Sequence, residues 1–314
     1  MVVSNALDKK IFGTLFFSIF AAVTGVGIVV PLLPVYAHGL GASGLYIGLI
    51  FGSFSLSRTF FLPYFGRKSD KSGRKRLIVT GLAGYTLISV AFIFSTDVES
   101  LIAIRFLQGI ASSMMMPVIQ AYVGDITPKG REGFTMGLFN MSMFLGLSLG
   151  PLMGGGIMDS FGLEASFICM GALSLIGFFL SLFLLPPGSQ EQVQMRNRPP
   201  IKWGRIVQDR EVVGLFIFRV CYTACIGIIW GFLPVLADAE LALSSSTIGV
   251  LVMMGVFISG AIHMPMGYLA DRINRKMMIM IGGLLVTAAM IGFARAGSIQ
   301  GMIIASIFFG FGGG

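Results

Sequence analysis

Long apolar runs dominate this chain of 314 residues and limit its fold more than any other feature. Lipid offers no partner for backbone N–H and C=O groups, so a segment of about 20 apolar residues that crosses a bilayer must form an α-helix. Only 11% of the residues are charged, whereas a soluble domain carries about a quarter. The sequence therefore predicts an all-α, multi-pass membrane protein. Nine spans are predicted, at residues 11–37, 45–65, 77–95, 99–123, 134–158, 165–185, 212–236, 246–268 and 277–294, and a tenth begins near residue 299.

The first apolar run follows Lys9 and Lys10 and in this respect looks like the start of a secretory signal peptide. The apolar part of a signal peptide is roughly 7 to 15 residues long, and the run over residues 11–36 is longer. We therefore expect a retained first span.

Positive charge lies in alternate loops. Lys and Arg precede the first span and follow spans two, four, six and eight, whereas the other loops carry no Lys or Arg before Arg295. Because basic residues concentrate in cytoplasmic loops, the N-terminus is predicted to be cytoplasmic and the protein to lie in the inner or plasma membrane. The net charge of +8 is thus a property of the loops, and we expect no nucleic-acid partner.

One long polar segment, residues 186–211, divides the chain. It contains two proline pairs and mixed charges but almost no apolar surface to bury, which predicts a cytoplasmic linker rather than a folded domain. The predicted organisation is a six-helix bundle at residues 1–185, the linker, and a partial second bundle at residues 212–314.

The two parts of the chain resemble each other at an offset of about 200 residues. The sequence Leu-Pro-Val at residues 33–35 recurs at residues 233–235, and the loop after the second span resembles the loop after the eighth. Six spans separate the copies. Because this number is even, both copies have the same topology, which predicts two parallel repeats related by an axis along the membrane normal.

The chain stops at Gly314 inside an apolar run. A terminal carboxylate and unpaired carbonyl groups would then lie in hydrocarbon, which is costly. We interpret the sequence as truncated in the tenth span, so that the second bundle is incomplete and this fragment alone is not expected to transport.

The loop after the second span has the pattern Gly66-x-x-x-Asp70-x-x-Gly73-Arg74-Lys75. Glycines at both ends permit a tight reversal, and Asp70 can cap or neutralise a helix end beside the cations. The charges alone would serve as a cytoplasmic anchor.

This pattern resembles the G-x-x-x-D-[RK]-x-G-R-[RK] signature between helices two and three of the major facilitator superfamily. The loop after the eighth span is similar, with Asn274 in place of the inner glycine. The resemblance implies two six-helix bundles and a cytoplasmic charge gate that locks them in the outward-facing state. The residues that match the gate are Gly66, Asp70, Arg74, Asp125 and Arg131 in the first half and Gly267, Asp271 and Arg275 in the second. Asp125 could also cap the turn that follows it, and the two roles are compatible.

The fourth span contains Arg105-x-x-Gln108-Gly109. An arginine near the centre of a span costs at least about 2.5 kcal/mol, so it normally faces a cavity, a water path or a partner. Alternatively, Arg105 could snorkel to the outer surface, because Glu99 is only about two turns away. The pattern resembles the helix-four signature of the same superfamily, which implies a role in proton coupling or substrate binding.

The fifth span contains Gly146-x-x-x-Gly150-Pro151-x-x-Gly154-Gly155. Glycines four residues apart lie on one helix face and allow a neighbouring helix to approach closely, and Pro151 permits a bend. Packing alone accounts for that much. The pattern also resembles the motif of the drug:proton antiporter branch, whose members have 12 spans, and this resemblance implies export.

Arg58 in the second span and Arg219 in the seventh are further intramembrane cations, and no Asp or Glu lies deep in any span. These arginines either meet an anionic substrate or pair with backbone carbonyls and with spans that the sequence lacks. Thr24 occupies the first span where some antiporters of the superfamily carry a carboxylate, so the proton carrier is an open question.

Other residues are candidates to line a cavity. His263 could relay a proton near neutral pH or pack as a neutral residue. The remaining candidates, which could equally face lipid or fill the core, are Asn140, Tyr222, Trp230 and the methionines at 114–116.

The sequence has no phosphate-binding loop, no His-Glu-x-x-His pattern and no Cys/His ligand spacing. Its three cysteines lie inside apolar runs, which favours core packing. We therefore expect neither an enzyme nor a metal or cofactor site.

These patterns together predict a proton-coupled exporter of amphipathic or lipophilic compounds, with membrane lipid, a small-molecule substrate and protons as partners. The alternative is a transporter of small organic anions or sugar-like metabolites that uses Arg58, Arg105 and Arg219. A transporter-like sensor that does not transport is a third hypothesis.

Overall fold

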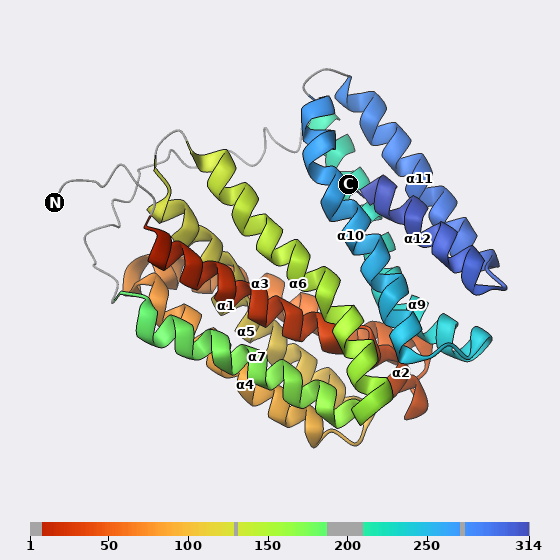
Figure 1. Cartoon of the computed structure of the whole chain (residues 1–314), viewed down its shortest axis with the longest axis horizontal. Coiled ribbons are helices and arrows are strands. Elements are labelled where there is room, and N and C mark those ends of the chain that lie inside the picture. Colours follow the sequence, from red (N-terminus) through yellow and green to blue (C-terminus); the bar gives the residue numbers. More distant parts are fainter. Residues whose placement is uncertain (1–7, 129–130, 187–209, 271–273, 314) are drawn as a thin grey trace.

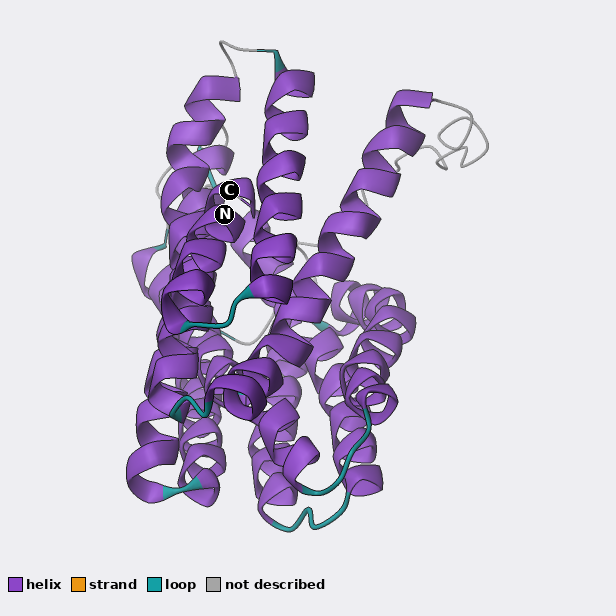
Figure 2. Ribbon diagram, turned by 90° about the vertical axis from the view of Figure 1, so that its right-hand side faces the viewer, coloured by secondary structure: helices purple, strands orange, loops and turns teal. Residues whose placement is uncertain are grey.

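The computed structural model describes residues 8–128, 131–186, 210–270 and 274–313. These residues form helices joined by short turns (Figures 1 and 2). Within the described ranges, nine helical segments have the length and composition to cross a membrane, and one further apolar helix is shorter. The prediction of an all-α, multi-pass fold is confirmed.

The helices follow the predicted spans in order. They are α1 (Lys9–Val29), α2 (Leu32–Gly39), α3 (Gly44–Ser72), α4 (Arg74–Ile93), α5 (Val98–Ile126), α6 (Glu132–Phe161), α7 (Leu163–Leu184), α9 (Arg210–Leu241), α10 (Ser245–Ala270), α11 (Arg275–Arg295) and α12 (Ile299–Gly313). The predicted linker, residues 186–211, lies almost entirely outside the described residues.

The first predicted span consists of two helices, because α1 ends shortly before Pro31 and α2 begins directly after it. The amide of Val30 makes the last backbone bond of α1, to the carbonyl of Val26. Proline has no N–H to continue that ladder, so the helix is interrupted at this residue.

Acidic side chains close the ends of helices where they leave the apolar region. Asp8 accepts hydrogen bonds from the amides of Lys10 and Ile11 at 3.0 and 3.1 Å. Asp97 accepts one from the amide of Ser100 at 2.7 Å at the start of α5. These caps satisfy N–H groups that the first turn of a helix leaves unpaired.

The turn between α3 and α4 differs from the prediction of a glycine at each end. Gly66 lies inside α3, which continues to Ser72, and only Gly73 separates the two helices. Gly73 has φ of +88°, a conformation that side-chain-bearing residues rarely adopt. A single residue with positive φ is enough to reverse the chain here, so Gly66 has no role in the turn.

Two hydrophobic cores divide the described helices. The first holds buried residues from Leu15 to Leu185, and the second holds buried residues from Ile229 to Phe309. Buried serines join helices within the first core, as in the 2.9 Å contact between the hydroxyls of Ser18 on α1 and Ser181 on α7. Such short polar contacts between small residues favour helix association in lipid, where apolar burial gives little driving force.

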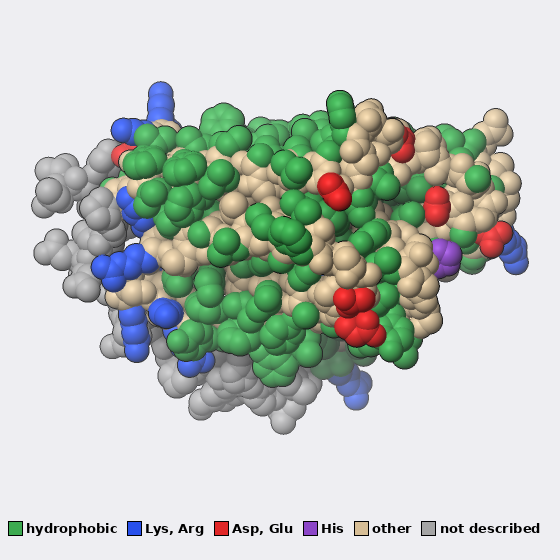
Figure 3. Space-filling model, turned by 90° about the horizontal axis from the view of Figure 1, so that it is seen from below, with side chains coloured by type: hydrophobic (Ala, Val, Ile, Leu, Met, Phe, Trp, Pro, Cys, Tyr) green, Lys and Arg blue, Asp and Glu red, His purple; other side chains and the backbone are tan. Residues whose placement is uncertain are grey.

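Charged side chains gather toward opposite ends of the molecule. Most of the Lys and Arg side chains visible in Figure 3 lie toward the left, and most of the Asp and Glu side chains lie toward the right, with an apolar surface between them. We call the end with the start of α1 and the α3–α4 turn the basic end. The opposite end, which holds Asp97, Asp159 and Glu164, is called the acidic end. Figure 1 shows α6 and α10 close together at the acidic end and apart at the basic end.

Candidate functional site around a buried arginine

Arg105 lies in the first third of α5, about two turns from its start, and is almost completely buried, with 3% of its surface exposed. Its Nη1 donates a hydrogen bond of 2.6 Å to Oε1 of Gln108, one turn further along the same helix. Its Nε donates to the carbonyl oxygen of Ile50 on α3 at 3.4 Å. The guanidinium therefore points into the α3–α5 interface, and the snorkelling alternative does not describe this structure.

Two aromatic rings of α3 flank the same guanidinium. The ring centres of Phe51 and Phe54 lie 5.1 and 4.5 Å from Cζ of Arg105, within the range of cation–π attraction. Sequence inspection missed both residues because nothing in an apolar run marks which phenylalanine faces a cation on another helix.

The close approach of α3 and α5 depends on Gly109. A Cβ atom at this position would overlap the hydroxyl of Ser57 and the carbonyl of Phe54. The glycine thus brings the Phe54 ring and the Arg105 side chain into one interface.

Arg105 forms no salt bridge with any residue that the structure describes. A buried cation without a carboxylate is costly, and here an amide, a carbonyl and two rings stabilise it. Chemically, the site can attract an anionic or polar group, and it disfavours a second fixed cation.

The other predicted arginines do not contact Arg105 directly. Arg58 on α3 is half-buried, and Arg219 on α9 is exposed, with its Cζ 5.7 Å from the ring centre of Tyr222. No interaction within the described residues joins either of them to Arg105. Arg58 and Arg105 nevertheless both act electrostatically on the buried hydroxyl of Tyr85, whereas Arg219 does not, so the structure brings two of the three arginines to one region.

The remaining cavity candidates are dispersed. Tyr222 donates to the carbonyl of Gly313 at 3.3 Å and stacks on Phe309, so it belongs to the second core. Trp230 is half-buried on α9, and Asn140 is exposed on α6. His263 lies in α10, but its side chain is outside what the structure describes.

The gate residues of the first half meet at the basic end. Arg74 pairs with Oδ1 of Asp70 at 2.5 Å and with Oδ2 of Asp125 at 2.9 Å, and its Nη1 donates to the hydroxyl of Ser69 at 2.6 Å. One guanidinium thus connects α3, α4 and α5. Lys75 adds a bond of 2.5 Å from Nζ to the carbonyl of Leu185, at the end of α7.

The described partners of this gate all belong to the first core. Arg131 is exposed at the start of α6. In the second half, Asp271 lies outside the described residues, and neither the surroundings of Gly267 nor the side chain of Arg275 is described. A lock between the two halves stays a prediction.

The glycine motif of α6 serves two helices. Gly146, Gly150 and Gly154 face α1, where a Cβ atom would meet Phe20, Gly27 and Ile28 respectively. Gly155 instead faces the backbone of Ser245 on α10, and the carbonyl of Pro151 faces Gly249 on the same helix. The motif therefore packs α6 on its own core with one face and on the second core with the other.

The acidic end holds a contact that sequence inspection did not single out. Oδ1 of Asp159, in the last turn of α6, accepts from the amide of Ser245 at 3.0 Å, and Oδ2 accepts from the amide of Ser246 at 2.8 Å. In the sequence, Asp159 is visible only as one acid of an acidic loop, because its partners lie 86 and 87 residues away.

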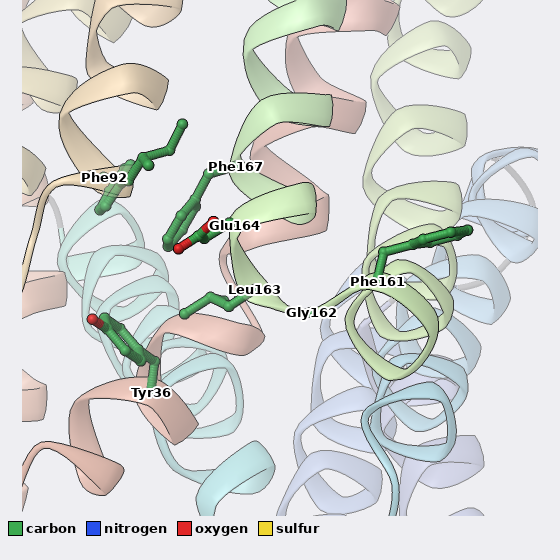
Figure 4. Close-up of a pocket in the computed structure, with 8 residues that line it drawn as sticks. Tyr36, Phe92, Phe161, Gly162, Leu163, Glu164 and Phe167 are labelled. Carbon is green, nitrogen blue, oxygen red and sulfur yellow. The ribbon is translucent and has the colours of Figure 1, made fainter.

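A cavity of about 380 Å³ opens at the same end, between α2, α4 and the α6–α7 turn. Figure 4 shows Tyr36, Phe92, Phe167 and Glu164 around it. Tyr36 donates to the carbonyl of Ser95 at 2.8 Å, and the rings of Phe92 and Phe167 stack with centres 5.1 Å apart. These contacts fix the aromatic walls of the cavity within the first core.

Comparison with known families identifies the fold. The family model described as Major Facilitator Superfamily matches residues 15–314. The chain belongs to the major facilitator superfamily. It is accordingly a multi-pass transporter and not an enzyme.

Several curated members of the superfamily are similar in sequence. An uncharacterized MFS-type transporter of Methanocaldococcus jannaschii is 29% identical over 288 residues, which cover 90% of this chain and 74% of the relative. Multidrug resistance protein 2 of Bacillus subtilis is 26% identical over 293 residues, covering 91% and 72%. The quinolone resistance protein NorA of Staphylococcus aureus is 32% identical over 179 residues, covering 57% and 46%.

Solved structures confirm the fold at low sequence identity. A crystal structure of the nucleoside transporter NupG has a TM-score of 0.79 at 15% identity and covers 96% of this chain and 80% of NupG. A bacterial homologue of the human lysosomal transporter Spinster has a TM-score of 0.77 at 13% identity, covering 98% and 74%.

Proposed function

We propose that this protein exports amphipathic or lipophilic compounds in exchange for protons, by alternating access between its two halves. Multidrug resistance protein 2 and NorA, which are similar over much of the chain, support this substrate class. The glycine motif of α6 supports export, because it resembles the motif of the drug:proton antiporter branch.

We propose that the basic end is cytoplasmic. Lys and Arg concentrate in cytoplasmic loops, and Arg74, Lys75 and the start of α1 all lie at this end. Substrate would then enter from the basic end or the inner leaflet and leave at the acidic end.

The observation that carries the proposal is the double packing of α6. Its glycines contact α1 of the first core and α10 of the second core. A helix that packs closely on both halves gives a contact about which the halves can rock, which is how parallel-repeat transporters alternate access. In this proposal the moving units are residues 1–185 and residues 212–314, and residues 186–211 are the linker between them.

Arg105 supplies the fixed charge of the proposed transport site. Its guanidinium lies between α3 and α5, where it can hold a polar group of the substrate or of a proton path. Residues ionised at this depth are costly and usually functional.

Dye accumulation tests the proposal. Cells that express the gene should accumulate less ethidium than cells without it, and a protonophore should abolish the difference. Cells that express Arg105→Gln to the same level should behave like cells without the gene. Unchanged accumulation across a broad panel of lipophilic compounds would contradict the proposal.

Transport of small organic anions is a second candidate, because Arg105 has no carboxylate partner among the described residues. In that case Arg58→Gln or Arg219→Gln should abolish uptake or efflux of the anion. An exporter of lipophilic compounds should tolerate Arg219→Gln, since this side chain is exposed.

A further inference from the structure

The contact between α6 and α10 at the acidic end is made by the two backbones. A Cβ atom at Gly155 would overlap the carbonyl of Ser245, and one at Gly249 would overlap the carbonyl of Pro151. Because each glycine faces the backbone of the other helix, neither contact can be relieved by a side-chain rotation. The backbones of the two cores are therefore in direct contact here.

The carboxylate of Asp159 closes this contact. Its two oxygens accept from the amides of Ser245 and Ser246, the first two residues of α10, at 3.0 and 2.8 Å. The hydroxyl of Ser244, the residue before α10, accepts a hydrogen bond from the amide of Thr247 at 3.3 Å. The helix thus has a cap of its own for one N–H group and depends on the first core for two others.

We propose that Asp159 is a positioning residue for transport: it caps α10 from the other half and so stabilises the conformer that is closed at the acidic end. We call the set of Asp159, Ser245, Ser246, Gly155 and Gly249 the acidic-end latch. A carboxylate at the N-terminus of a helix is favoured by the helix dipole as well as by its hydrogen bonds. Loss of this contact favours the conformer in which the acidic ends of the two cores separate.

The latch can open reversibly because it lies at the end of the helices. Asp159 is two residues from the end of α6, and Ser245 is the first residue of α10. Separated groups at this end are hydrated by water, whereas the same groups at mid-membrane would find no partner. The cost of opening is therefore that of a helix cap, and losing the charged cap should lower the closed-to-open ratio roughly 5- to 30-fold.

This inference goes beyond the proposed substrate and coupling. It concerns the balance of two conformers and is measured without substrate, so its failure and the failure of the export proposal are distinguishable.

Distance measurement between spin labels on the two cores tests it. Labels are placed on cysteines at His38 of α2 and Glu240 of α9, both exposed, after replacement of the three native cysteines. In lipid nanodiscs Asp159→Asn should raise the population with a long distance. Asp97→Asn is the matched control, because Asp97 caps α5 through Ser100 within the first core. Asp97→Asn should leave the distances unchanged.

A glycine pair gives an independent readout if Asp159→Asn does not fold. Gly155→Ala should shift the same distances toward the long population, whereas the neighbouring Gly156→Ala has open space around its Cβ atom and should not. Unchanged distances in Asp159→Asn, or an equal shift in Asp97→Asn, would overturn the proposal. So would equal distances in the two glycine variants.

Discussion

Arg74 on α4 donates from Nε to Oδ2 of Asp125 on α5 at 2.9 Å, and its Nη1 reaches both Asp70 and Ser69 on α3. A single side chain therefore connects three helices at the basic end. Since Asp125 is nearly half exposed, with 44% of its side-chain surface accessible, water screens the pair strongly. Its contribution to stability is small, so an effect of its loss on transport would report a role in the conformational cycle.

Replacing Asp125 with Asn should separate these two roles. We expect the free energy of unfolding to change by less than about 1 kcal/mol, because exposed ion pairs contribute no more than that. Transport should fall at least about tenfold, the factor for about 1.4 kcal/mol, if the network belongs to the gate. Glu99→Gln, at the opposite end of α5, is the control. Efflux and thermal-denaturation assays on the two variants measure transport and stability in parallel. Equal efflux in Asp125→Asn and Glu99→Gln would contradict a role of Asp125 in the gate.

The packing of α3 on α5 predicts a loss of stability in Gly109→Ala. The added methyl group would overlap Ser57 and the backbone of Phe54, and overpacking of this kind costs about 1–3 kcal/mol. Gly52→Ala on α3 has open space around its Cβ atom and should be neutral. Thermal unfolding of the purified variants in one detergent measures the difference, and equal midpoints would show that the interface relaxes.

Arg105→Lys should fail to replace the arginine. Lysine keeps the charge, but it cannot donate with the planar geometry by which Arg105 reaches Gln108 and the carbonyl of Ile50. Charge-assisted hydrogen bonds are worth about 1.5–3 kcal/mol, so transport should fall roughly 10- to 100-fold. Arg58→Lys, at a half-buried position, should have a smaller effect. Initial efflux rates at matched expression measure this effect. Wild-type rates in Arg105→Lys would show that transport needs only the positive charge at this position and not the hydrogen bonds of the guanidinium.

The proposed orientation predicts which end a membrane-impermeant thiol reagent reaches. In a background without native cysteines, His38→Cys at the acidic end should react in intact cells, and Lys71→Cys at the basic end should react only after lysis. Both positions are exposed, so accessibility alone does not separate them. The opposite pattern would place the basic end outside.

The helices and their order could be predicted from the sequence because lipid leaves the backbone few choices. An apolar run must be helical, and its length sets the span, which is why α3 to α7 and α9 to α11 follow the predicted runs. The break at Pro31 was missed because the run around it is apolar throughout, and hydropathy does not register a missing N–H group.

The contacts between helices were harder to predict. Arg105, Gln108 and the α6 glycines were found because a buried cation and a glycine spacing stand out in an apolar sequence. Asp159 was not, since its carboxylate acts on amides of another helix and resembles any loop acid in the sequence. Gly66 was given a role in a turn because the pattern contains two glycines, whereas a single positive φ at Gly73 reverses the chain.

Proton-driven transport in a defined membrane tests the central claim most directly. The protein expressed from its gene is reconstituted into proteoliposomes that contain a lipophilic dye, and a proton gradient is then imposed across the membrane. We predict that the dye leaves the lumen only when the gradient is present. The lumen should acidify as protons enter in exchange, and both effects should be lost in Arg105→Gln. Dye movement that is independent of the gradient, or absent while an organic anion is transported, would contradict the account.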